Sequence, residues 1–145
     1  MKEIDTTRFG RLTLTETAVI HFPQALYGME ACREFCLLEH DADTGFFWLQ
    51  SLDDPNVALI VTDPFRYFPD YEAEIPDPVS QALQAGEPAD ITLFTTVSVS
   101  KDRTAVSTNL LGPLAINREK GVGFQVIQHG SSYTCQHPLA LKSRC

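Results

Sequence analysis

The chain has 145 residues, of which 43% are hydrophobic and 21% are charged, and this composition is typical of one globular domain spanning residues 1–145. It has neither an apolar run long enough to cross a bilayer nor the apolar stretch of a signal peptide at its start, so we expect a cytoplasmic protein without a membrane partner. The formal net charge of −8 argues against direct binding to nucleic acid, because an acidic chain repels phosphates.

Short extended segments separated by turns dominate the first half of the chain. The clearest pair, residues 46–52 and 57–62, flanks the sequence DDPN at 53–56, which is typical of a tight turn. The second run has apolar side chains on both faces, as expected of a strand covered on both sides. We therefore predict a β-hairpin at the middle of the sheet. The other predicted strands of this half are 8–15, 19–22 and 35–38.

The second half combines one predicted helix with further strands. Asp77 as N-cap and Pro78 at the first helical position predict a helix over 77–84 that ends before Gly86. The predicted strands are 91–100, 106–116 with a bend at Gly112-Pro113, and 122–127. Seven to nine short strands with one short helix describe an all-β fold, either a small, partly open antiparallel β-barrel or a sandwich. We expect its interior to be filled by Trp48, Leu59, Val61, Leu93, Val97, Leu114 and Val126.

The segment from Asp63 to Glu72, DPFRYFPDYE, interleaves aromatic residues, prolines and carboxylates. Its two prolines stiffen it, and neither prolines nor acids suit the interior of a strand or helix. Two interpretations remain open. In one, the rings fold under the end of the barrel while the acids face water. In the other, the segment is an ordered acidic and aromatic edge that recognises a partner, since aromatic residues are enriched at interface centres.

Charge is distributed unevenly along the chain. Residues 39–90 hold twelve acidic residues and one basic residue, Arg66, whereas residues 91–145 hold two acidic and six basic residues. This acidic middle suits a basic protein partner. We predict a protein-binding surface, with Phe68 and Tyr71 as candidate aromatic anchors. Its residues are Asp53, Asp54, Asp63, Phe68, Asp70, Tyr71, Glu72 and Glu74.

No combination of residues indicates catalysis, a metal or a cofactor. Cys32, Cys36 and His40 have the spacing of one helical face, but residues 35–38 are better explained as a strand, so we predict no metal site. A reactive thiol needs a neighbouring base, which the sequence does not place. The paired aspartates of the 53–56 turn are more typical of amide capping than of acid–base catalysis. In a cytoplasmic protein the four cysteines are expected to be free, dispensable thiols.

Four stretches of the sequence, in order along the chain, match one known pattern. Residues 20–30, IHFPQALYGME, resemble I-x-F-P-x-G-L-x-G-F-E, and residues 108–117, TNLLGPLAIN, resemble T-x-N-L-x-A-P-I-x-I-N without matching every position. Between them, FWLQSLDDP, VTDPF and PDYE within 47–72 form the most recognisable block, and His137-Pro138-Leu139 fits the C-terminal end. Together these motifs resemble the flagellar assembly factor family, FliW, over essentially the whole chain.

The resemblance implies a non-enzymatic regulator in the bacterial cytoplasm that needs no cofactor. Members of this family bind flagellin. They also bind the carbon storage regulator CsrA, a basic translational repressor, and thereby relieve its repression of flagellin translation. Flagellin that accumulates before export occupies the family member and frees CsrA to repress again. This sequence departs from the family pattern at Ala25, Met29 and Gly112, where glycine, an aromatic residue and alanine are usual.

The sequence leaves one alternative to a protein-binding regulator open. A small-molecule-binding β-barrel, or an enzyme, would have a pocket lined by Phe46, Phe47 and Trp48, with His21 or His137 acting in it. A pocket lined by convergent polar groups favours this rival. A filled barrel with an acidic surface favours the regulator.

Overall fold

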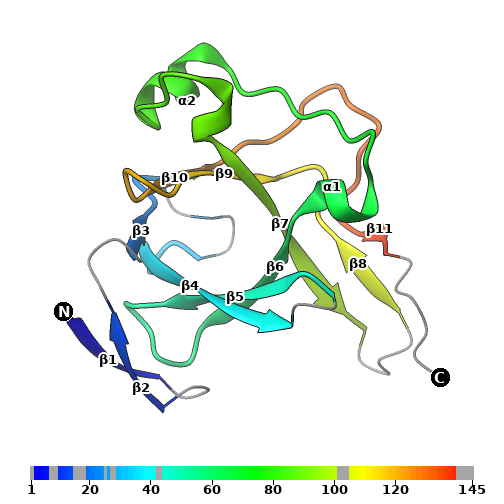
Figure 1. Cartoon of the computed structure of the whole chain (residues 1–145). Coiled ribbons are helices and arrows are strands. Elements are labelled where there is room, and N and C mark those ends of the chain that lie inside the picture. The colour runs from blue at the N-terminus through cyan, green and yellow to red at the C-terminus, as the bar shows by residue number, and fades with distance from the viewer. Residues whose placement is uncertain are drawn as a thin grey trace.

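The computed structural model describes residues 2–6, 10–14, 19–24, 26, 29–41, 44–100 and 105–139. Within these ranges the chain is mostly β-structure, with two short α-helices and one 3₁₀ turn (Figure 1). The strands are β1 (Lys2–Thr6), β2 (Gly10–Leu14), β3 (Val19–His21), β4 (Glu34–Asp41), β5 (Phe46–Ser51), β6 (Ala58–Thr62), β7 (Thr92–Val99), β8 (Val106–Thr108), β9 (Leu114–Asn117), β10 (Val122–Gln125) and β11 (His137–Pro138). The helices are α1 (Pro64–Tyr67) and α2 (Asp77–Ala82), and the 3₁₀ turn is Pro88–Asp90.

Strand β7 closes the sheet into a barrel. The strands follow the order β7-β6-β5-β4-β3-β10-β9, and β9 pairs back onto β7 from Thr92 to Phe94. The C-terminal half of β7 pairs with β8 instead, so β8 and β11 extend the sheet outside the closed barrel. All these pairings are antiparallel except the single parallel pairing of β10 with β3. The predicted all-β barrel is confirmed, and it is closed and mixed in strand direction.

One apolar cluster fills the barrel. Phe22 and Phe35 are fully buried at its centre and pack edge to face with ring centroids 5.6 Å apart. Gly123 of β10 makes room for the Phe22 ring, because a Cβ there would lie 2.7 Å from Phe22 Cε2. The other buried members of the cluster are Ile20, Leu26, Cys32, Leu49, Val61, Phe94, Leu114 and Ile116.

Successive side chains of a strand point to opposite faces, so the barrel strands also have apolar side chains on the outside. Two smaller clusters bury these outer side chains. One places Val97 with Phe46 and Leu139 beside α1. The other places Val126 with Leu83 at the end of α2, and its further members are Ala115, Val122, Ile75, Val79, Ala85, Ile91, Leu93 and Phe124. The short helices and the loops between them therefore bury the outer side of β7, β9 and β10.

Because apolar clusters lie on both the inner and the outer face of the barrel, only some of the predicted interior residues are in its interior. Leu59, Val61 and Leu114 belong to the interior cluster, as expected. The prediction was wrong for Leu93, Val97 and Val126, which pack in the outer clusters. The more apolar face of β7 lies on the outside of the barrel, and its other face contributes Phe94 to the interior. The prediction was also wrong for Trp48, which alternates with the inward-facing Phe47 and Leu49 and is half-buried on the outer face.

The predicted helix over 77–84 is present as α2, with shifted ends. Pro76 is the N-cap and Asp77 is the first helical residue, so the expectation that Asp77 caps the helix was wrong. Gln84, with a φ of 58°, ends the helix in the left-handed conformation. The amide of Ala85 donates to Ser80 O at 3.1 Å and that of Gln84 to Gln81 O at 3.0 Å, a Schellman arrangement. A glutamine therefore occupies the left-handed position at the helix end, where glycine is usual.

Several short elements carry too little pattern to be predicted. β11 has two residues and exists because it pairs with β8, at His137↔Thr108 and Pro138↔Ser107. β1 pairs with β2 in a separate two-stranded sheet at the N-terminal end of the described chain. In the described ranges, no helix is long and apolar enough to cross a membrane.

The close approach at Gly123 yields a stability prediction. Gly123→Ala places a methyl group against Phe22 and Ile116, so we expect it to lower the free energy of unfolding by about 1–3 kcal/mol, as overpacked cores do. The matched control is Gly86→Ala, where the new Cβ would meet Asp90 Oδ2 at an ordinary 3.7 Å. Urea unfolding of both variants measures the difference. An unchanged Gly123→Ala variant would show that the barrel interior is not close-packed at β10.

Candidate functional site

The segment 63–74, called the connector from here on, leaves the end of β6 and begins with α1. Asp63 is the N-cap of this helix, since its Oδ1 accepts a hydrogen bond from Phe65 N at 2.9 Å, and Pro64 lies in the first turn. Phe68 N donates to Pro64 O at 2.8 Å at the helix end. The helix leaves the Phe65 ring 42% exposed, which is unusual for a large apolar side chain in this protein.

Tyr71 ties the middle of the connector to the barrel. Its hydroxyl donates to Leu110 O at 2.6 Å, and its ring centroid lies 4.7 Å from that of Tyr133. Burial raises the pKa of the Tyr71 phenol, and the neighbouring Tyr133 raises it further, so the phenol remains a hydrogen-bond donor at neutral pH. Tyr71 is 5% exposed. It therefore holds the connector in place and does not offer its ring as a free anchor.

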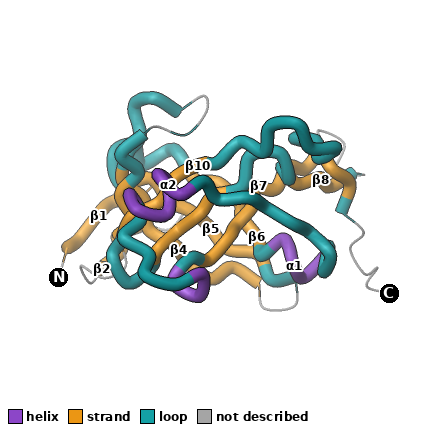
Figure 2. Tube along the Cα trace, turned by 90° about the horizontal axis from the view of Figure 1, so that it is seen from above, coloured by secondary structure: helices purple, strands orange, loops and turns teal. Residues whose placement is uncertain are grey.

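The second half of the connector runs beside residues 126–133 (Figure 1) and crosses over the barrel between α1 and α2 (Figure 2). Glu72 N donates to Tyr133 Oη at 3.0 Å. Gln128, which is buried, accepts from Glu74 N at 2.7 Å and donates to Glu74 O at 3.1 Å. These hydrogen bonds use the backbone of the connector, and the side chains of Glu72 and Glu74 remain exposed.

The Asp53-Asp54 turn lies apart from the connector. Asp53 Oδ2 accepts hydrogen bonds from Arg33 N at 2.7 Å and Glu34 N at 2.9 Å, and Asp54 Oδ1 accepts from Asn56 N at 2.9 Å. Both carboxylates thus cap backbone amides. The turn is at the opposite end of the β5–β6 hairpin from Asp63, and the five residues of β6 between them span about 17 Å at about 3.4 Å per residue.

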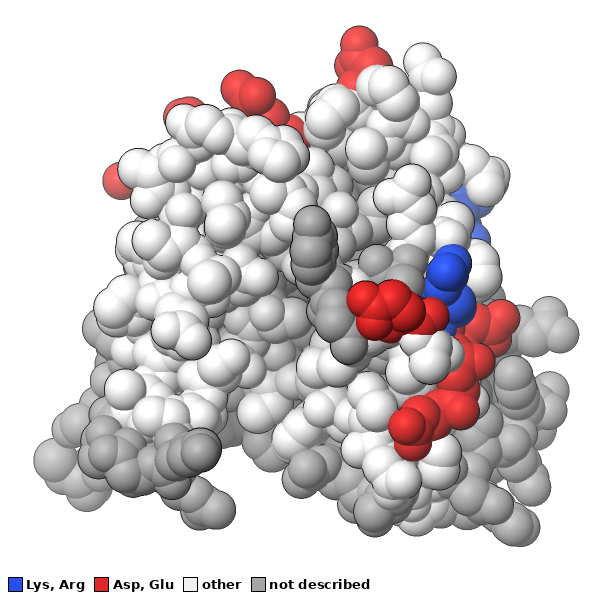
Figure 3. All heavy atoms as spheres, turned by 180° about the vertical axis from the view of Figure 1, so that it is seen from behind, with Lys and Arg blue, Asp and Glu red and all other residues white. Residues whose placement is uncertain are grey.

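The predicted binding residues therefore fall into two groups. The structure places Asp63, Asp70, Glu72 and Glu74 along the connector, all of them exposed, and leaves the 53–54 pair elsewhere. On the face drawn in Figure 3, acidic side chains form separate groups, and most of the described surface there is neither acidic nor basic. The acidity of residues 39–90 is thus spread around the molecule, and the connector holds the part of it that lies beside exposed aromatic and apolar side chains.

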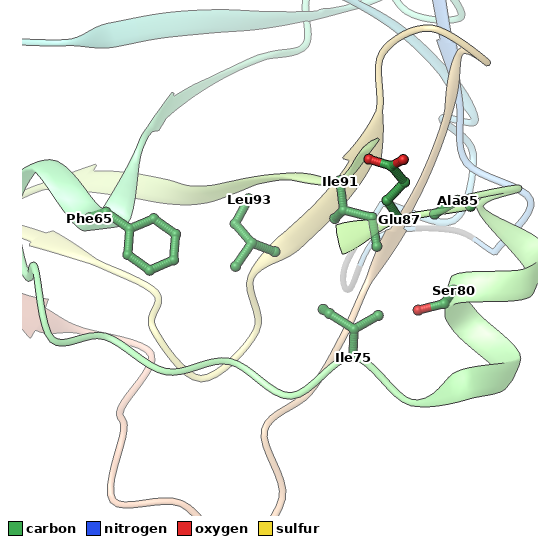
Figure 4. A pocket seen from close by; sticks show the side chains of 8 residues that line it. Phe65, Ile75, Ser80, Ala85, Glu87, Ile91 and Leu93 are labelled. Carbon is green, nitrogen blue, oxygen red and sulfur yellow. The ribbon is translucent and has the colours of Figure 1, made fainter. Parts of the chain in front are cut away.

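Two surface cavities flank the connector. The apolar cavity, of about 500 Å³, lies between the connector, α2 and the start of β7. Figure 4 shows Phe65, Ile75, Ile91 and Leu93 facing one another across it, with Glu87 at its edge. The second, here called the aromatic cavity, has a volume of about 320 Å³ and is lined by Tyr67, Phe68, Asp70, Tyr71, Tyr133 and His137 together with Pro69 and Leu110.

Two of the three described cysteines, Cys32 and Cys36, are buried. Cys36 lies on β4, so it does not share a helical face with Cys32 and His40. Burial raises the pKa of the Cys36 thiol to about 11, although a backbone hydrogen bond opposes this, and such a thiol is a poor nucleophile. Cys135 is exposed, and Cys145 lies outside the described residues. Among the described residues, no three His, Cys, Asp or Glu side chains converge as metal ligands.

Sequence reasoning missed Phe65 as the exposed ring of the connector and chose Tyr71 and Phe68 instead. Phe68 is half-buried and lines the aromatic cavity, where its ring packs edge to face on His137 at 5.0 Å. The useful signal was Asp63-Pro64, which is the usual start of a helix. A helix beginning at Pro64 turns Phe65 and Tyr67 to different sides, whereas an irregular loop gives no basis for choosing among the rings.

Comparison with known proteins gives one consistent relationship. A family model described as FliW protein matches residues 3–139. The flagellar assembly factor FliW of Moorella thermoacetica is 34% identical over 142 residues, covering 97% of this chain and 90% of that protein. The corresponding protein of Treponema denticola is 34% identical over 137 residues, covering 94% and 92%. A crystal structure of the flagellar assembly factor FliW superposes with a TM-score of 0.86 at 29% identity, covering 99% of this chain and all of that one.

The three departures from the family pattern have different structural settings. Ala25 lies outside the described residues. Met29 is partly buried and packs against the barrel interior. A Cβ at position 112 would lie 2.8 Å from Gln125 Nε2, which donates to Gly112 O at 3.0 Å. Alanine at this position therefore requires the Gln125 side chain to move.

Thiol accessibility gives a test of the placement of the cysteines. With iodoacetamide at neutral pH, we expect Cys135 to be alkylated in the folded protein and Cys36 to react more than about tenfold more slowly, because it is buried and its thiolate is scarce. Peptide mapping by mass spectrometry resolves the individual sites. Under denaturing, non-reducing conditions all four thiols should react. A disulfide under those conditions, or rapid labelling of Cys36 in the folded protein, would contradict this assignment.

Proposed function

This chain belongs to the FliW family of non-enzymatic flagellar assembly factors, and we propose that it binds flagellin and, in competition with it, the basic translational regulator CsrA. Binding of CsrA relieves its repression of flagellin translation. When flagellin accumulates it occupies this protein and releases CsrA, which then represses again. The protein thereby acts in the cytoplasm as a sensor of unexported flagellin.

Family membership over residues 3–139 is the observation that carries this proposal. The chemistry of the connector supports it independently. Asp63, Asp70, Glu72 and Glu74 give this surface a negative field, which accelerates encounter with a basic protein. Electrostatic steering alone gives little affinity, and the apolar cavity beside Phe65 supplies surface that a partner side chain can bury.

The rival function, a small-molecule barrel or an enzyme, has less support. The interior that would hold a ligand is occupied by the apolar cluster around Phe22 and Phe35. Phe47 packs edge to face on Phe94 with ring centroids 5.7 Å apart, and Phe46 packs against Tyr67 at 6.3 Å. These rings are therefore used in packing, as in a filled barrel whose surface carries the function.

A competition experiment with purified proteins tests the proposal as a whole. Labelled CsrA is bound to this protein, and flagellin from the same organism is then titrated into the complex. We expect flagellin to release CsrA with a midpoint that rises with the CsrA concentration. Failure of either partner to bind, or a stable complex that holds both at full occupancy, would contradict the proposed exchange.

Charge reversal on the connector tests electrostatic steering. Asp70→Lys combined with Glu72→Lys should slow association with CsrA by at least about tenfold at low salt, because it turns two attractive charges into repulsive ones. Stopped-flow association at about 10 mM and about 150 mM salt measures this, since the screening length falls from about 30 Å to about 8 Å. The control reverses two other exposed acids, Glu30 and Glu119. Unchanged association of the connector variant at low salt would remove this surface from the proposal.

Truncation of Phe65 tests the apolar contribution. Phe65→Ala should leave association with CsrA nearly unchanged and raise the dissociation rate by about 30-fold, the effect of losing about 2 kcal/mol at a hot spot. Val99→Ala is the matched control, because Val99, at 47%, is the other strongly exposed large apolar side chain among the described residues. Equal dissociation rates for the two variants, both first shown to be folded by thermal unfolding, would rule out Phe65 as an anchor.

A further inference from the structure

The aromatic cavity is lined by rings from two distant parts of the chain. Tyr67, Phe68 and Tyr71 come from the connector, and Tyr133 and His137 come from the C-terminal segment. The Tyr71 and Tyr133 ring centroids lie 4.7 Å apart with a 60° angle between the planes, and those of Phe68 and His137 lie 5.0 Å apart at 86°. The rings therefore meet at steep angles, so they form a walled cavity and not a parallel stack.

The hydroxyl groups of the three tyrosines are already engaged with the backbone. Tyr67 donates to Thr44 O, Tyr71 donates to Leu110 O at 2.6 Å, and Tyr133 accepts from Glu72 N at 3.0 Å. These bonds fix the orientations of the rings before any ligand arrives. A ligand in the cavity thus meets preordered aromatic surface, and the loss of side-chain freedom on binding is small.

Among the described residues that line this cavity, the formal charge, with histidine neutral, is negative. Asp70 contributes a carboxylate and is exposed, and Glu72, also exposed, lies two residues further along the connector. The faces of aromatic rings carry partial negative charge and attract cations. A carboxylate beside several rings is therefore a combination that favours a cation over a neutral group of the same shape.

We propose that the aromatic cavity binds the guanidinium group of an arginine side chain from a basic protein partner. Guanidinium is planar and weakly hydrated, stacks on aromatic faces, and pairs with a carboxylate through two parallel hydrogen bonds. The volume of about 320 Å³ accommodates one long side chain. The proposal depends on the proposed function only for which protein carries the arginine, because the site itself is complete in this chain.

An NMR titration of the full chain with a small probe tests the cavity without any partner. The probe is N-acetyl-arginine-N-methylamide, and its neutral isostere is the citrulline derivative, which has the same length and planarity. We expect the arginine probe to shift the ring signals of Phe68, Tyr133 and His137 and to bind at least about tenfold more tightly than the citrulline probe. Equal binding of the two probes, or shifts elsewhere in the protein only, would overturn the proposal.

Two variants test whether the arginine probe binds in the aromatic cavity. Phe68→Leu keeps an apolar side chain and removes the ring, and Asp70→Asn removes the charge at an exposed position. Each should weaken the arginine probe at least about fivefold and leave the citrulline probe unchanged. Glu87→Gln, which removes an exposed carboxylate at the edge of the apolar cavity, is the control. Undiminished arginine binding in both cavity variants would overturn the proposal, whereas loss of CsrA binding in the competition experiment would refute the proposed function alone.

Discussion

The double pairing of β7 is the constraint on which the rest of this structure depends. Residues 92–94 pair with β9 and residues 97–99 pair with β8, while β6 lies along the other edge. The first pairing closes the barrel, and the second sends β8 and β11 outside it. Because the apolar side chains of Leu93 and Val97 lie on the outer side of β7, that side must also be covered, and the residues between β6 and β7 provide that cover.

The surface features of the connector follow from this requirement. β6 and β7 are antiparallel neighbours that a short turn could join, yet residues 63–91 separate them. The excursion covers one outer cluster with α1 and the other with α2, and Tyr71 and Gln128 fix its path between the two. The apolar cavity and the aromatic cavity lie beside this crossing segment, where side chains do not fill the space. The same segment that completes the packing thus presents the carboxylates and Phe65 to solvent.

Much of the fold was predictable from local pattern, but the contacts that define the surface were not. The hairpin around the 53–56 turn and the bend at Gly112-Pro113 have local causes, and both were predicted. The burial of Tyr71 depends on Leu110 and Tyr133, which lie far away in sequence. Amide capping by Asp53 was predicted, but the amides that it caps, those of Arg33 and Glu34, are also far away in sequence and were not. Residue type alone could not decide which ring of the connector is buried, because all of them are apolar enough for either position.

We propose that the connector is the surface through which this protein meets a basic partner. Hydrogen exchange of the backbone amides, measured with and without saturating CsrA, tests this proposal. We expect slower exchange confined largely to residues 63–76 and to the adjoining segment 126–137. Protection of the β1–β2 hairpin or of β3 and β4, with the exchange of the connector unchanged, would contradict it.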